Sequence, residues 1–282
     1  MSRGNQCLIP SVLLREVEYA RPSSVEEAIG LLGAHEGARA LAGGQTLVNV
    51  MKARAASPDV LVDLNGLEEL RAISVSGDTL RLGAMATYTQ IMTSAEVEVS
   101  RPVLAEVAAQ IADVQVRNRG TIGGNVCSND PTNHLPPLLV ALGASMTIRD
   151  TGGERTVSAE EFFLGVYMTA VAEGELLLSV SVPASATAAD GFASVTIGRD
   201  GTCIANAAAS LSGDAPRLAL GCVDAVPVLL TPSGTDDDAV RQAVEAAGLE
   251  PPSDVHASAE YRRHLAAVCA VRAVQQAQER GR

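Results

Sequence analysis

A pair of adjacent glycines in the segment A-G-G-Q-T-L, residues 42–47, is the first candidate for binding chemistry. Glycine lets the backbone adopt positive φ and approach a ligand closely. An apolar run precedes the pair and a helical pattern follows it, so free N–H groups at the helix start favour an anion such as a pyrophosphate, with Thr46 as a further donor. A strand-to-helix turn that binds nothing stays open, because the spacing is neither G-x-G-x-x-G nor that of a P-loop.

A second glycine pair lies in T-I-G-G-N, residues 121–125. Successive N–H groups at Gly123 and Gly124 would make an anion-binding concavity. Hydrogen-bonding side chains that suit a polyhydroxyl ligand follow: Asn125, Ser128, Asn129 and Asp130. An ordered surface loop is the alternative here, whereas two such loops together favour a long ligand with a diphosphate and a sugar-like part. Arg117 and Arg119 are either solvated charges or contacts for a phosphate or an acidic partner.

The first loop is predicted to lie in an N-terminal α/β unit of about 65 residues. Ser24 and Glu27 form a capping box that opens an amphipathic helix with Ala28, Leu31 and Leu32 inward. Strands are expected at 39–42 and 60–64, with a helix from 47 to 53 between them. This order places the glycine pair at a strand-to-helix turn.

The second loop is predicted to lie in a region of different character. A hairpin is expected from strands 70–75 and 80–84, because Ser76–Thr79 is a turn sequence rich in Gly and Asp. Helices are expected at 87–97, 102–112 and 132–142. The stretch from Val116 to Pro131 is polar and non-periodic, so it is predicted to be irregular. Strands are expected again at 145–149 and 175–182.

The small polar residues 183–190 predict a domain boundary. Strands at 192–197, 204–211 and 217–223 are expected beyond it, followed by helices at 238–247 and 259–278. The last helix carries an apolar stripe at spacings of three: Leu265, Val268, Val271 and Val274. A small C-terminal α+β domain with a three-stranded sheet is therefore predicted.

Composition excludes several classes of function. The net charge of −12 argues against a nucleic-acid partner, and aromatic residues make up only 2% of the 282 residues. Five cysteines without C-x-x-C spacing and four histidines without H-x-x-x-H spacing predict no metal site and no disulfide framework. No apolar run approaches the ~20 residues of a membrane span. The N-terminus is interpreted as mature sequence, and the expected compartment is the cytoplasm.

Several segments, in order along nearly the whole chain, resemble a known family: Y-x-R-P-S-S-V-x-E-A at 19–28, A-G-G-Q-T-L at 42–47, V-R-N-R-G-T-I-G-G-N at 116–125, D-P-x-x-x-L-P at 130–136, F-F-x-G-x-Y-x-T-A at 162–170, E-L-L at 175–177 and A-S-A-E-Y-R-R-H-L at 257–265. The family comprises the medium, FAD-binding subunits of molybdenum hydroxylases, which are relatives of the carbon monoxide dehydrogenase flavoprotein and of the flavin domain of xanthine dehydrogenase. The T-I-G-G-N segment and its flanks are specific, whereas A-G-G-Q-T-L alone is weak.

The resemblance implies an α+β fold: a two-subdomain FAD-binding domain of vanillyl-alcohol-oxidase (PCMH) type over residues 1–183, divided at about 70, and a small C-terminal domain over residues 191–282. FAD would lie between the subdomains. The residues that the resemblance assigns to the cofactor are Ala40, Leu41, Ala42, Gly43, Gly44, Gln45, Thr46, Leu47, Ile111, Thr121, Ile122, Gly123, Gly124, Asn125, Asn129, Asp130, His134 and Leu177.

The chain departs from the family pattern at two places. His134 stands where relatives commonly have a carboxylate, so either an imidazole contacts the cofactor or His134 is a surface residue. A lysine that xanthine dehydrogenases place near the flavin is absent, and Val195 and Thr196 occupy that region. By alignment, Cys127 lies near the isoalloxazine ring or is simply a small packed residue.

The resemblance implies an oxidoreductase subunit without catalytic residues of its own. FAD would receive electrons from a small partner with two [2Fe–2S] clusters, while a large molybdopterin partner oxidises the substrate, in a dimer of heterotrimers. No G-x-S-x-G and no Cys–His constellation indicates another chemistry. The alternatives are a standalone FAD-dependent oxidoreductase of the same fold and a non-enzymatic nucleotide-binding protein. The resemblance places the choice of substrate in the large subunit and leaves the electron acceptor open.

Overall fold

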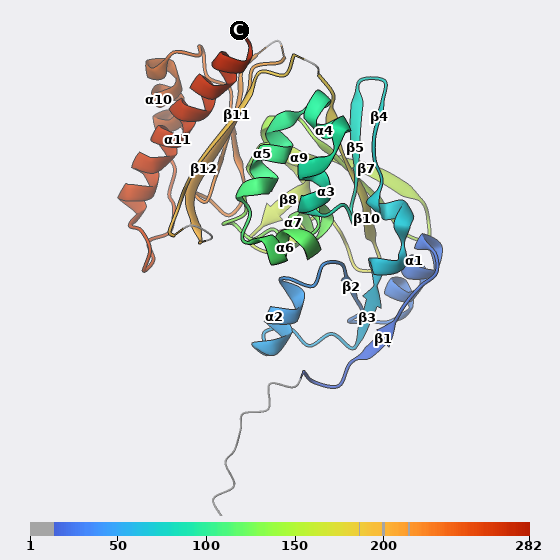
Figure 1. Ribbon diagram of the computed structural model, residues 1–282. Coiled ribbons are helices and arrows are strands. Elements are labelled where there is room, and N and C mark those ends of the chain that lie inside the picture. The colour runs from blue at the N-terminus through green and yellow to red at the C-terminus, as the bar shows by residue number, and fades with distance from the viewer. Residues whose placement is uncertain (1–13, 186, 199–200, 214) are drawn as a thin grey trace, which may run out of the picture.

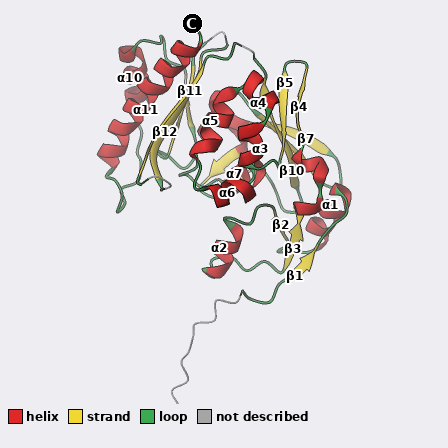
Figure 2. Ribbon diagram, in the orientation of Figure 1, coloured by secondary structure: helices red, strands yellow, loops and turns green. Residues whose placement is uncertain are grey.

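The computed structural model describes residues 14–185, 187–198, 201–213 and 215–282. Figure 1 shows three regions in chain order: a small sheet near the N-terminus, a larger sheet with a group of short helices, and a C-terminal sheet covered by two helices. Figure 2 shows that each region contains both helices and strands. The central helices lie between the larger sheet and the C-terminal sheet.

The N-terminal region is a parallel three-stranded sheet in the order β1-β3-β2. Its elements are β1 (Glu18–Ala20), α1 (Val25–Ala34), β2 (Arg39–Leu41), α2 (Leu47–Lys52) and β3 (Val60–Asp63). The predicted helix start is confirmed, since Ser24 Oγ accepts a hydrogen bond from Glu27 N at 3.1 Å. Glu27 does not complete the capping box, because its carboxylate accepts from the backbone N–H of Ser23 instead.

The central sheet is antiparallel, in the order β4-β5-β10-β6-β7. Its strands are β4 (Ile73–Ser76), β5 (Thr79–Gly83), β6 (Ser145–Arg149), β7 (Glu154–Ser158) and β10 (Leu176–Pro183). The predicted hairpin is confirmed, with Gly77 at φ +56° in its turn. Two 3₁₀ helices, η1 (Leu64–Gly66) and η2 (Glu68–Arg71), connect the first sheet to the second.

Short helices pack against the central sheet: α3 (Tyr88–Thr93), α4 (Ala95–Ser100), α5 (Pro102–Gln110), α6 (Val114–Arg119), α7 (Ile122–Ser128), α8 (Leu135–Ala141) and α9 (Ala159–Phe162). They share one buried apolar core with β5, β6 and β10. The single helix predicted over 87–97 is wrong, because Ser94 leaves the helical conformation at ψ 125° and caps α4 through Val97 N. A two-stranded hairpin, β8 (Phe163–Gly165) and β9 (Met168–Thr169), also forms between the strands predicted at 145–149 and 175–182, where no element was expected.

The stretch predicted to be irregular, Val116–Pro131, instead contains the end of α6 and all of α7. Side chains outside the helices drive both starts: Asp113 accepts from Val116 N at 2.8 Å, and Thr121 accepts from Gly124 N at 3.0 Å. Helix propensity alone disfavours the two glycines of α7. Tertiary packing overrides that preference, because a Cβ on Gly123 would lie 2.6 Å from the Ala84 carbonyl oxygen.

The C-terminal region is an antiparallel sheet in the order β11-β12-β13-β14, with two helices on one face (Figure 1). Its elements are β11 (Asp190–Thr196), β12 (Cys203–Ser210), β13 (Arg217–Gly221), β14 (Val228–Leu230), α10 (Asp237–Ala246) and α11 (Ala259–Arg280). The three predicted strands and both helices are confirmed. The short edge strand β14 escapes prediction because only three residues pair.

A buried ion pair joins the C-terminal region to the central one. Arg101 Nη1 lies 2.6 Å from Asp190 Oδ2, and the two side chains are 4% and 1% exposed. Arg101 Nε also donates to the Pro183 carbonyl oxygen at 2.6 Å. A buried charge needs a partner of opposite sign, so each of these residues depends on the other region. Among the described residues, none of the helices is long and apolar enough to cross a membrane.

Candidate functional site

The two glycine loops, far apart in sequence, touch each other in the fold. A Cβ on Gly43 would lie only 2.0 Å from the Arg119 carbonyl oxygen and 3.0 Å from Gly120 Cα. A Cβ on Gly124 would lie 3.8 Å from Ala42 Cβ. Only glycine permits this close approach of two backbones at position 43. The sequence predicted that both loops serve one ligand, and the fold brings them together.

The first loop is open toward a ligand. Gly44 has φ +73°, and the backbone N–H groups of Gly43, Gly44, Gln45 and Thr46 donate to no other described residue. A cavity of about 340 Å³ adjoins the loop, lined by Leu41, Ala42, Gly43, Gly44, Gln45, Val48, Asn49, Lys52 and Arg119. Unpaired N–H donors beside two cationic side chains attract an anionic group such as a diphosphate. The remaining predicted residues of this segment, Ala40 on β2 and Leu47 at the start of α2, flank the cavity wall.

The second loop is closed by its own fold. The N–H of Ile122 donates to Ala86 O and that of Gly123 donates to Ala84 O, both at 2.9 Å. The N–H of Gly124 donates to Thr121 Oγ1. The predicted concavity of free N–H groups at Gly123 and Gly124 is therefore wrong, because each of these donors already has a partner. The glycines serve close packing here, while Gly124 stays exposed beside the first loop.

Asn125 is the polar side chain of the second loop with an unused acceptor. It is 8% exposed, and its Nδ2 donates to Tyr88 Oη at 3.0 Å. Burial raises the pKa of Tyr88 to about 12, so the phenol stays neutral. Asn125 Oδ1 is buried and has no hydrogen-bond partner in the part of the chain that the structure describes. A buried acceptor without a partner is costly, and a hydroxyl or N–H of a bound cofactor would satisfy it.

Asn129 and Asp130, two further predicted cofactor residues, make their side-chain contacts with the β8–β9 hairpin. Asn129 Nδ2 donates to the carbonyls of Gly165 and Met168 at 2.7 and 3.1 Å. Asp130 Oδ2 accepts from Tyr167 Oη at 3.2 Å. Both residues thus hold the β8–β9 hairpin against the end of α7.

The β8–β9 hairpin is a feature that sequence reasoning missed, although its F-F-x-G-x-Y segment was among the matching motifs. Its apolar side chains are exposed: Leu164, Val166, Tyr167 and Met168. Tyr167 has φ +58°, an uncommon conformation for a bulky residue that costs about 1 kcal/mol or more. Clustered exposed apolar side chains on a held hairpin are typical of a protein-binding surface.

The other predicted residues lie outside the contact between the loops. Leu177 on β10 is 3% exposed in the central core, and Ile111 is a half-buried residue that ends α5. His134 is buried against Phe192 of the C-terminal sheet, with ring centroids 5.6 Å apart. Burial lowers the pKa of His134 to about 4, and its Nε2 has no partner. Cys127 is exposed on α7.

Residues 15–185 match the family described as FAD binding domain in molybdopterin dehydrogenase, and residues 184–277 match the CO dehydrogenase flavoprotein C-terminal domain. The chain is 34% identical to the carbon monoxide dehydrogenase medium chain of Afipia carboxidovorans, over 94% of this chain and 98% of that one. It is also 34% identical to the nicotine 6-hydroxylase medium subunit of Paenarthrobacter nicotinovorans, over 89% and 94%.

A solved structure of carbon monoxide dehydrogenase from Hydrogenophaga pseudoflava agrees with this fold, at a TM-score of 0.89 and 35% identity, over 95% of this chain and 99% of that one. The fold and the glycine site define an oxidoreductase subunit with an FAD-binding domain of PCMH type. The chain belongs to the molybdenum hydroxylase family of FAD-binding medium subunits.

The residues present fit FAD. The open N–H groups of the first loop, with Lys52 and Arg119, suit its pyrophosphate, and the unpartnered Asn125 Oδ1 suits one of its hydroxyl or N–H groups. Among the described residues, no group of three or more His, Cys, Asp or Glu side chains is arranged to hold a metal ion.

Proposed function

We propose that this chain is the electron-transferring FAD subunit of a molybdenum hydroxylase complex. The open first loop, with its unpaired N–H groups and adjoining cations, is the observation that carries the proposal. Bound FAD supplies the redox chemistry, and the protein supplies position and electrostatics. Electrons pass from iron–sulfur clusters of a partner subunit to FAD and on to an external acceptor.

The roles of the predicted residues follow from their positions in the fold. The segment Ala40–Leu47 binds the pyrophosphate, and Gly124 and Asn125 hold the flavin side of the cofactor. Thr121, Ile122 and Gly123 form and pack the helix that carries these contacts. We further propose that the FAD-binding domain spans residues 1–183, with subdomains meeting at about 70, and that residues 191–282 form a separate domain.

The partner subunits are proposed to be a large molybdopterin subunit and a small subunit with [2Fe–2S] clusters, in a dimer of heterotrimers in the cytoplasm. The exposed apolar side chains of the β8–β9 hairpin support docking of a protein partner at the end of α7. This location would hold the partner close to the helix that bears Asn125. The sequence relatives named above occur as medium chains or medium subunits.

The test is an absorption spectrum of the protein purified with everything that co-purifies. Flavin bands near ~450 nm with an iron–sulfur shoulder, two further polypeptides, and flavin reduction only when the molybdenum partner receives substrate are the expected results. Flavin without partners, with turnover of a simple alcohol or of reduced nicotinamide, would instead establish a standalone flavoenzyme. No flavin after incubation with FAD would overturn the cofactor assignment.

A further inference from the structure

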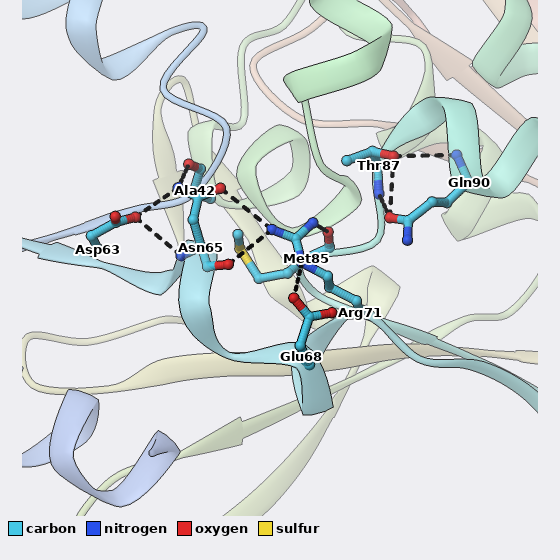
Figure 3. A network of polar contacts seen from close by, with 8 residues as sticks. All are labelled: Ala42, Asp63, Asn65, Glu68, Arg71, Met85, Thr87 and Gln90. Atoms are coloured by element: carbon cyan, nitrogen blue, oxygen red, sulfur yellow. Dashed lines mark hydrogen bonds and ion pairs between the residues drawn. The ribbon is translucent and has the colours of Figure 1, made fainter. Parts of the chain in front are cut away.

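The carbonyl group of Ala42, in the first glycine loop, is held by a single side chain. Asn65 Nδ2 donates to Ala42 O at 3.0 Å, as Figure 3 shows. Asp63 fixes Asn65 in turn, since Asp63 Oδ1 accepts from Asn65 Nδ2 at 2.6 Å and from Asn65 N at 3.0 Å. Tyr19 donates to the other carboxylate oxygen of Asp63. The amide of Asn65 therefore has a fixed direction before any ligand arrives.

Arg71 connects Asn65 to a second part of the molecule. Its Nη2 donates to Asn65 O at 3.2 Å and contacts Asn65 Oδ1 at 3.4 Å. Its Nη1 donates to Met85 O at 3.4 Å. The guanidinium thus lies between η1 and the segment after β5 (Figure 3). Its remaining contact, 3.6 Å to the Glu68 carboxylate, involves a side chain that is 82% exposed and contributes little.

The segment around Met85 is the support of the second glycine loop. The carbonyls of its two neighbours, Ala84 and Ala86, accept the N–H groups of Gly123 and Ile122. Thr87 pairs with Thr121 in an isolated β-bridge, and Gln90 completes a capping box on Thr87 (Figure 3). A displacement of Met85 would therefore move the start of α7.

We propose that Arg71, acting with Asn65, is a positioning residue that sets the spacing between the two glycine loops. The inference rests on the proposed FAD site. The Arg71 guanidinium contacts both Asn65, which binds the first loop, and the Met85 carbonyl, whose neighbours bind the second loop. The distance between the two loops is therefore fixed before the cofactor binds. Neither side chain lines the cavity beside the first loop, so neither is assigned a direct contact with FAD.

The planar guanidinium is essential to this role. Its two Nη groups reach acceptors on opposite sides at once, which a single ammonium on a flexible stem does not reproduce. A preorganised site also binds its ligand more tightly, because less ordering remains to be done on binding. A lysine at position 71 would therefore keep the positive charge and lose the simultaneous contacts with Asn65 and Met85.

The experiment compares Arg71→Met, Arg71→Lys and Asn65→Ser in the full chain, with Arg81→Met as control because Arg81 is an exposed arginine on β5. FAD affinity is measured by titration of the chain stripped of flavin. The visible circular dichroism of the bound flavin reports its orientation, and thermal unfolding of the stripped chain reports stability. Arg71→Met and Arg71→Lys should both weaken FAD binding about tenfold and alter the dichroism, while Arg81→Met changes neither.

Non-additivity gives a second readout. Because Asn65 and Arg71 act in one chain of contacts, the double variant Asn65→Ser/Arg71→Met should lose less affinity than the two single losses combined. Full recovery of affinity and dichroism in Arg71→Lys would overturn the proposal, as would an Arg71→Met variant equal to Arg81→Met. A wild-type chain that binds no FAD would instead overturn the proposed function, and the role of Arg71 with it.

Discussion

The two glycine loops have similar sequences and opposite roles. In residues 43–46, the backbone N–H groups donate to none of the residues that the structure describes, and a cavity lined by two cations adjoins them. In residues 121–125, the N–H groups of Ile122, Gly123 and Gly124 are all used within the chain. The first loop offers donors to a ligand, whereas the second uses its glycines to bring α7 against Ala84.

The difference shows that a glycine pair in a sequence encodes close backbone approach, and that the fold decides what approaches. At Gly123 the neighbour is the chain itself, at Ala84. At Gly44 the space beside the backbone is a cavity. Gly43 belongs to both cases, because it faces Arg119 on one side and lines the cavity on another.

Replacement of Gly123 by alanine should have the largest effect on folding. The new Cβ would lie 2.6 Å from the Ala84 carbonyl oxygen, which is backbone and cannot rotate away. We expect a loss of about 2–3 kcal/mol in the free energy of unfolding, measured with urea on the chain without FAD. Gly124→Ala is the matched control, since its Cβ would meet side-chain atoms and no backbone, Thr121 Oγ1 at 3.0 Å and Ala42 Cβ at 3.8 Å. Equal midpoints for the two variants would refute the packing role of Gly123.

Protonation of His134 should weaken the contact between the central region and the C-terminal sheet at acidic pH. In the folded protein the pKa of His134 is lowered to about 4, whereas in the unfolded chain it has its ordinary value of about 6.5. The free energy of unfolding should therefore fall as pH drops from about 6.5 toward 4, by about 2 kcal/mol. His134→Leu should remove this pH dependence and leave the affinity for FAD unchanged. The control is His264→Leu, at an exposed histidine of α11, which should leave the pH dependence in place. Lost FAD affinity in His134→Leu would place the imidazole at the cofactor instead.

The cations beside the first loop should have the smallest effect. Lys52→Met and Arg119→Met each remove one positive charge from the wall of the cavity, and neither substitution fills the cavity. We expect each to weaken FAD binding about fivefold at low salt, and less as salt screens the pyrophosphate. Titrations at several ionic strengths measure this, with Arg81→Met as control. A salt dependence identical to that of the wild type would mean that neither cation faces the phosphates.

Much of the fold could be predicted from local signals. The capped helix α1, the hairpin with Gly77 in its turn and the three long strands of the C-terminal sheet follow from patterning and turn chemistry. The helices α6 and α7 could not, because the polar residues of α6 and the two glycines of α7 disfavour a helix locally. The side chains of Asp113 and Thr121 cap the two helices, and Gly123 of α7 also packs against Ala84, which is distant in sequence.

The resemblance named the residues of the candidate site but not the contacts that each of them makes in the fold. The family resemblance assigned Asn129, Asp130 and His134 to the cofactor together with the glycine loops, and these assignments stay predictions. In the fold Asn129 and Asp130 hold a hairpin, and His134 packs on Phe192. Arg71 was missed altogether, because a lone arginine in a connecting segment gives no signal until the two carbonyls it bridges are located.

The buried pair Arg101–Asp190 limits how this chain could be recombined with its relatives. The two matching families meet at residues 184 and 185, which invites exchange of one half for another at that point. Such a chimaera separates Arg101 from the carboxylate that neutralises it, since Asp190 lies beyond the junction. A C-terminal half from a relative with no acidic residue at position 190 would leave the Arg101 guanidinium buried without an opposite charge. Inheritance of the halves as a pair is therefore favoured, although each half is recognisable alone.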